Sequence, residues 1–155
     1  MDRRRFIAAG LGLTPLAAVL SACGSSGAWP EGMAEIKWDR DTCVRCSMVI
    51  SDRRFAAEMR GGEKNTVFKF DDIGCAAFWI RDRQKDYPWL TEAATRFWVA
   101  DVGSSTGEKW LEARKAQYVG GKTSPMGYNY GARSYAEAGS FDFSEMSSHV
   151  LAKGK

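Results

Sequence analysis

Short apolar runs, separated by polar turns such as "RGGEKN", follow one another from residue 34 to residue 102. Runs of this length that alternate apolar and polar residues, or that are rich in β-branched and aromatic ones, are typical of strands. We expect strands at residues 34–38, 47–51, 55–60, 66–70 and 96–102. The chain is therefore expected to be built mainly from short strands.

Helical signals are fewer. The clearest is "DDIGCAAFWIRDRQK" at residues 71–85, where Asp71 or Asp72 can cap a helix, basic residues crowd its end and Pro88 lies just beyond. A second helix is expected from Ser144 to about Lys153. Residues 108–119, "EKWLEARKAQYV", stay open between helix and strand.

The two halves of the chain share an order of features. Each has a methionine, a strand, an "AE" turn and an aromatic-x-Phe strand that leads into an acidic-capped helix. Met48 falls opposite Met126, and "FKFDDIGC" falls opposite "FDFSEMSS". This order predicts an α+β fold of two small related β-rich units, each finishing in a helix, over residues 34–94 and 95–155.

The N-terminus carries the features of an export signal. Arg3, Arg4 and Arg5 precede an apolar run over residues 6–20 that is too short to span a bilayer. "RRRFI" resembles the twin-arginine export signal, and "LSAC" resembles the lipobox of bacterial lipoproteins. We expect a signal peptide over residues 1–22, lipidation of Cys23 and a Gly/Ser-rich tether over residues 23–33. The protein is then a membrane-anchored lipoprotein of the cell envelope that faces the periplasm.

Net charge gives no support for a nucleic-acid partner. The formal charge of the chain is +3, but residues 1–22 hold three Arg and one Asp, which leaves about +1 for the mature protein. Most of the excess positive charge therefore belongs to the export signal. About 130 residues remain, enough for one ordinary domain or two very small ones that share a core.

The segment "DTCVRCSMVISD" at residues 41–52 places Cys43 and Cys46 two residues apart and Met48 just after them. A thioredoxin-type redox pair needs a helix after the cysteines, whereas "SMVIS" reads as a strand. A structural zinc site is a second interpretation, with Cys43, Cys46, Cys75 and His149 as ligands. A plain disulfide between Cys43 and Cys46 is the third, because exported thiols tend to oxidise.

Copper in its +1 state explains the mixture of cysteine and methionine better. Cu(I) is a soft ion that favours thiolate and thioether sulfur, whereas Zn²⁺ gains little from methionine. Cys43, Cys46 and Met48 supply both donor types, and Met126 in "SPMGY" lies on a turn that favours exposure of its thioether. A methionine beside "VI" is also a common core residue, so the core alternative stays open for Met48.

Other noticeable residues are interpreted as structural. Cys75 reads as a small buried hydrophobe in a helix, and His149 as a surface or helix-end residue. Helix capping explains Asp71 and Asp72 without paired catalytic carboxylates. A single late histidine and the lack of a phosphate-cradling Gly loop in the sequence give no support for an enzyme.

A family resemblance connects these features. "DTCVRCSMVISDRRFAAE", "FKFDDIGC", "KWLEARKAQYV" and "SPMGY", in this order behind a lipoprotein signal, resemble the nitrous oxide reductase accessory protein family, NosL. Ser47 stands where relatives often have Gly. The resemblance implies a membrane-tethered periplasmic chaperone, not an enzyme, that binds Cu(I) and helps to load nitrous oxide reductase through contact with that enzyme or its assembly machinery.

The resemblance also implies a fold and a set of ligands. The fold is two related small ββαβ-like units, similar to part of organomercurial lyase. Carried over by position, the candidate copper ligands are Cys43, Cys46, Met48 and Met126.

Overall fold

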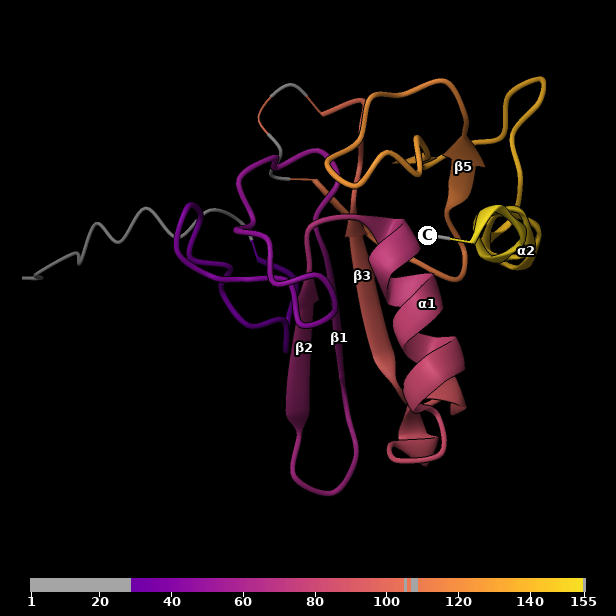
Figure 1. Ribbon diagram of the computed structural model, residues 1–155. Coiled ribbons are helices and arrows are strands. Elements are labelled where there is room, and N and C mark those ends of the chain that lie inside the picture. Colours follow the sequence, from indigo (N-terminus) through magenta and orange to yellow (C-terminus); the bar gives the residue numbers. More distant parts are fainter. Residues whose placement is uncertain (1–28, 105, 107–108, 155) are drawn as a thin grey trace, which may run out of the picture.

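A computed structural model describes residues 29–104, 106 and 109–154 of the chain, and in that part the protein contains two sheets and two α-helices (Figure 1). The elements in chain order are β1 (Ala57–Gly61), β2 (Thr66–Phe70), α1 (Ile73–Arg83), the 3-10 helix η1 (Pro88–Thr91), β3 (Arg96–Ala100), β4 (Trp110–Glu112), β5 (Gln117–Val119), β6 (Gly131–Arg133) and α2 (Phe143–Lys153). Within the described residues, neither helix has the length and apolar character needed to cross a membrane.

The larger sheet is antiparallel, with strand order β2-β1-β3-β4. Met59 in the middle of β1 pairs with Phe68 of β2 and Phe97 of β3, and all three side chains lie in the main core. Phe78 of α1 and Met146 of α2 belong to the same core. α1 therefore covers one face of this sheet, and α2 packs against α1 and β5 (Figure 1).

Residues 29–38 cover the opposite face of the sheet. Met33 and Ile36 are buried there in a smaller apolar cluster, which the tryptophans of β3 and β4 border. Glu58 of β1 points to this side, and its Oε1 accepts a hydrogen bond from the Ala34 amide (2.7 Å). Burial raises the pKa of Glu58 to about 7. The segment is thus fixed to the sheet through a side chain rather than through strand pairing.

Most expected elements are confirmed. The strands expected at 55–60, 66–70 and 96–102 appear as β1, β2 and β3. Asp72 caps α1 by accepting from the Gly74 amide, and Asp142 caps α2 in a capping box with Glu145. Residues 108–119, which the sequence left open, contribute β4 and β5.

Two expected strands are wrong. Residues 34–38 have no strand assignment, because the segment crosses the sheet face instead of joining an edge. Residues 47–51 contain a single bridge, from Val49 to Thr42, because the chain turns at Ser47. Only one side chain is buried in each segment, Ile36 in the first and Ile50 in the second, and neither segment forms a strand.

The two predicted units share a sheet. The expected boundary between residues 94 and 95 falls just before β3, which pairs with β1 of the first half. β5 and β6 form the second sheet, and each half ends in a helix. The division into units stays a prediction, and the signal peptide, Cys23 and the start of the tether lie outside the described residues.

Candidate metal centre

The cysteine loop, residues 41–50, is a tight turn closed by backbone hydrogen bonds. The Cys43 amide donates to the Met48 carbonyl (2.8 Å), and the Ser47 amide donates to the Cys43 carbonyl (2.9 Å). Ser47 has a φ of 62°, in the left-handed region that glycine adopts most readily. A glycine would adopt this conformation with less strain than serine.

The cysteine loop is attached to the end of β2, where α1 begins. The Val44 amide donates to the Lys69 carbonyl (3.0 Å), and the Lys69 ammonium forms a 2.6 Å ion pair with Asp41. Asp71 follows β2 directly, and Cys75 lies in the first turn of α1 with its amide bonded to the Asp72 carbonyl (2.9 Å). The loop therefore places its two cysteines beside the start of α1.

Four side chains form what we name the metal-site cluster: Cys43, Cys46, Asp71 and Cys75. Their sulfur and carboxylate oxygen atoms all lie within 4.8 Å of one another, and the three cysteines are free thiols. Four ligands at about 2.3 Å from a tetrahedral ion lie about 3.8 Å apart. Small side-chain adjustments are thus enough for the cluster to enclose a metal ion.

Burial within the cluster is uneven. Cys43, Asp71 and Cys75 are at most 1% exposed, whereas Cys46 is partly exposed. The Cys46 sulfur lies 3.4 Å from each oxygen of the Asp71 carboxylate. Among the four side chains, Cys46 therefore gives solvent or a partner its access to the cluster.

Hydrogen bonding separates the acidities of the three thiols. A hydrogen bond from the Cys75 side chain lowers the pKa of Cys43 to about 7, and the amides of Cys46 and Asp71 add to this effect. Cys75 keeps its proton in that bond, so its pKa is raised, and burial raises the pKa of Cys46 to about 12. Cys43 is therefore the most acidic of the three thiols.

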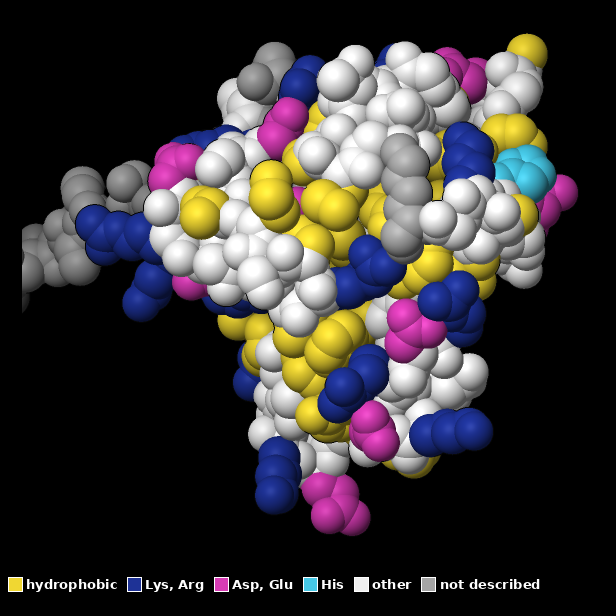
Figure 2. Space-filling model, viewed as in Figure 1, with side chains coloured by type: hydrophobic (Ala, Val, Ile, Leu, Met, Phe, Trp, Pro, Cys, Tyr) yellow, Lys and Arg dark blue, Asp and Glu magenta, His cyan; other side chains and the backbone are white. Residues whose placement is uncertain are grey.

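The two predicted methionine ligands lie in different surroundings. The side chain of Met48 is 50% exposed and follows the accessible Cys46 in the chain. Met126 is partly buried, and its amide donates to the carboxylate of Asp72 (3.2 Å). Asp72 lies between Asp71 and Cys75 in the chain. Figure 2 shows hydrophobic side chains where the cysteine loop meets the start of α1, bordered by Lys and Arg. Met48 is thus at the surface beside the cluster, and the backbone of Met126 is held near it.

The alternative zinc set of Cys43, Cys46, Cys75 and His149 is not assembled. His149 packs edge-on against Phe141, with ring centroids 4.6 Å apart, and its Nδ1 lies 3.4 Å from the Tyr130 hydroxyl. Asp71 takes the fourth place in the cluster instead. Sequence reasoning assigned Asp71 to capping, although α1 needs one cap and Asp72 supplies it.

Contacts from the second half of the chain cover the start of α1. Arg45 of the cysteine loop donates to the Tyr128 hydroxyl (2.9 Å), and its guanidinium lies 4.2 Å from the centre of the Phe78 ring. The Tyr128 ring lies so close to Gly74 that an added Cβ would be 2.2 Å from its Cδ2. Gly74 therefore allows the Tyr128 segment to approach the helix next to the metal-site cluster.

Comparison with solved structures gives an informative match. Neither a protein-family model nor a curated protein sequence matches the chain. The crystal structure of the copper chaperone NosL from Shewanella denitrificans is similar, with a TM-score of 0.53 and 18% identity over 79% of this chain and 89% of that one. At this identity the likeness concerns the fold, and the chain is therefore a small mixed α/β protein with a NosL-like fold.

Proposed function

We propose that the protein is a metallochaperone that carries Cu(I) in the metal-site cluster. The observation that carries this proposal is the grouping of three free cysteine sulfurs and one carboxylate within 4.8 Å, with one sulfur accessible. Thiolate sulfur is the donor type that Cu(I) prefers. The likeness in fold to a copper chaperone supports the same choice.

Ligand exchange is the proposed mechanism of transfer. Cu(I) tolerates a change in the number of its sulfur ligands, so a donor from a partner can bind before a donor of this protein leaves. Cys46 is partly exposed and Met48 is half exposed, so a partner's donor enters on their side. The thiols of Cys46 and Cys75 lose their protons when the ion binds and regain them when it leaves. The ion passes between proteins without being released to solvent.

A zinc-stabilised protein-binding module is the second candidate, favoured by one observation. The Asp71 oxygen is a hard donor that suits Zn²⁺ better than Cu(I), and it lies among three cysteines. Competition between the two ions for the reduced protein, purified intact in detergent, separates the candidates. We expect about one Cu(I) to bind in preference to Zn²⁺, because sulfur outnumbers oxygen in the cluster. Retention of Zn²⁺ alone would establish the module instead.

The proposed setting is the periplasmic face of a membrane, with Cys23 lipidated and nitrous oxide reductase, or its assembly machinery, as recipient. The lipobox-like "LSAC" and the resemblance to NosL support this setting. Cells that lack the protein should contain nitrous oxide reductase with reduced copper content and activity when external copper is scarce. The wild-type protein should fractionate with membranes, and Cys23→Ser should release it or block its processing.

Added copper is the control in this experiment, because an excess should partly restore the recipient. A recipient that is fully metallated at low copper in the deletion strain would refute delivery. A wild-type protein that stays soluble in the periplasm would refute the anchor alone.

A further inference from the structure

Asp72 connects the metal-site cluster to a distant loop. In the chain it follows Asp71, and its carbonyl accepts from the amide of Cys75. Its side chain is fully buried: Oδ1 accepts from the Gly74 amide (3.0 Å), and Oδ2 accepts from the Ser124 hydroxyl (2.6 Å) and the Met126 amide (3.2 Å). One carboxylate thus holds the start of α1 and the segment of Met126 together.

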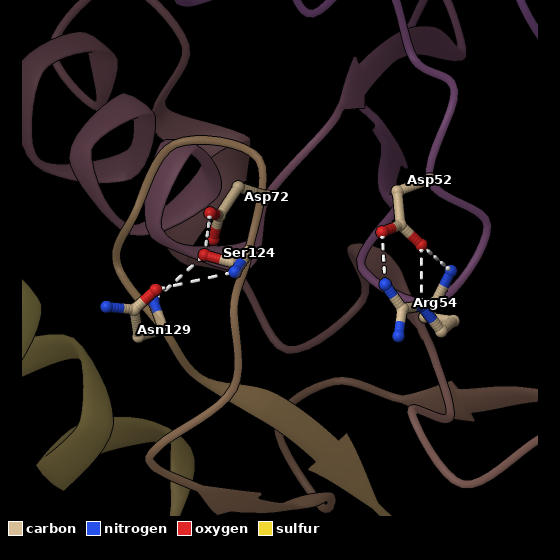
Figure 3. Close-up of polar contacts among 5 residues, drawn as sticks. All are labelled: Asp52, Arg54, Asp72, Ser124 and Asn129. Carbon is tan, nitrogen blue, oxygen red and sulfur yellow. Dashed lines mark hydrogen bonds and ion pairs between the residues drawn. The ribbon is translucent and has the colours of Figure 1, made fainter.

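The Met126 loop, residues 124–129, is closed on itself around Ser124. The Asn129 amide donates to the Ser124 hydroxyl (2.8 Å), the Ser124 amide donates to the Asn129 side-chain oxygen (3.4 Å), and the Gly127 amide donates to the Ser124 carbonyl (3.0 Å). Gly127 and Asn129 have positive φ values of 69° and 67°, which close the turn. Figure 3 shows Ser124 between Asn129 and Asp72. The loop is therefore preformed, and the Ser124 hydroxyl joins it to Asp72.

We propose that Asp72 and Ser124 are positioning residues that hold the Met126 thioether available to an ion in the metal-site cluster, and that this link sets the preference for Cu(I) over Zn²⁺. The inference rests on the proposed function and adds a source of its selectivity. A thioether strengthens the binding of Cu(I) but adds little for Zn²⁺. Side chains that orient a ligand without touching the ion commonly affect metal affinity.

Ser124→Ala tests the link, because it removes the shared hydroxyl and leaves the cluster's own ligands in place. In the intact protein, we expect Cu(I) affinity, measured against a Cu(I) chelator, to fall about 10- to 100-fold. Zn²⁺ affinity should not change. Met126→Leu should cause a similar loss, and the double variant should be no weaker than Met126→Leu alone, because both changes remove the same donor. X-ray absorption should show a thioether on Cu(I) only where both residues are intact.

Ser140→Ala is the matched control, because the Ser140 hydroxyl also joins two segments but lies outside the metal-site cluster. It should leave both affinities unchanged. An unchanged Cu(I) affinity in Ser124→Ala, or an equal loss for both ions, would overturn the inference. If Ser124→Ala does not fold, Asn129→Gly provides the test. Glycine tolerates the positive φ of this position, and the change removes the hydrogen bond from the Ser124 amide to the Asn129 side chain. It should weaken the binding of Cu(I) and leave the binding of Zn²⁺ unchanged.

Failure of the inference can be told apart from failure of the proposed function. If the wild-type protein binds no Cu(I), the proposed function fails. If it binds Cu(I) and Met126→Leu has no effect, the cluster carries copper without this methionine, and only the positioning roles of Asp72 and Ser124 are refuted.

Discussion

Cys75→Ser is expected to lower the Cu(I) affinity by more than about 100-fold, because it removes a proposed ligand. Replacing a residue that only orients a ligand typically lowers metal affinity about 10- to 100-fold, and the loss of a ligand should cost more. A serine hydroxyl is a poor donor for a soft ion. It is similar in size to a thiol, and it can still donate a hydrogen bond to the Cys43 sulfur. The variant should therefore remain folded while it loses copper.

Competition with a Cu(I) chelator measures the loss, and a thermal unfolding curve verifies the fold. Ala76→Ser is the matched control, because it places a hydroxyl at the next buried position of α1, outside the metal-site cluster. It should keep its Cu(I) affinity. Wild-type affinity in Cys75→Ser would mean that Cys75 only packs in the core, which is the structural interpretation given to it from the sequence.

Cu(I) affinity should rise about 100-fold per pH unit between pH 8 and 9, because each proton that the metal displaces adds a factor of ten per unit. In this range Cys43, with a pKa of about 7, is already a thiolate. Cys46, with a pKa of about 12, and Cys75, whose pKa is also raised, both still carry protons that Cu(I) has to displace. Below pH 7 Cys43 is protonated too. Cu(I) then displaces three protons, and the change in its affinity should approach about 1000-fold per pH unit.

Titrations at several pH values, with a chelator of known proton affinity, measure this slope. Cys46→Ser removes one displaced proton, so its slope should fall to about tenfold per pH unit. A slope near zero in the wild-type protein would show that the three thiols are already ionised in the free cluster.

Elements with strong local signals could be predicted from the sequence. α1 and α2 have acidic caps and basic last turns, and β1, β2 and β3 lie in the short apolar or alternating runs. Residues 108–119 contain helix formers such as Glu, Lys and Ala, yet β4 pairs with β3. Tertiary pairing decides the structure there, and local propensity does not reveal it.

The sequence predicted only part of the metal-site cluster: Cys43 and Cys46 as copper ligands, and Cys75 only in the zinc alternative. Cys43 and Cys46 are recognisable from their spacing, because both lie in one loop. Asp71 and Cys75 join them through the attachment of that loop to Lys69, which is a contact between distant parts of the chain. Two adjacent acids at a helix start were a usable signal for Asp71, because one cap leaves the other carboxylate free for a different role.

The single accessible side chain of the metal-site cluster has a consequence for the order of events in the proposed copper transfer. Because Cys46 alone among the four side chains is partly exposed, a copper donor and a copper acceptor would have to use the same opening in turn. Transfer would then follow ping-pong kinetics, in which the donor departs before the acceptor arrives. Metal-free acceptor in excess would occupy the empty chaperone and compete with its reloading, so a larger supply of recipient would slow the cycle at limiting copper.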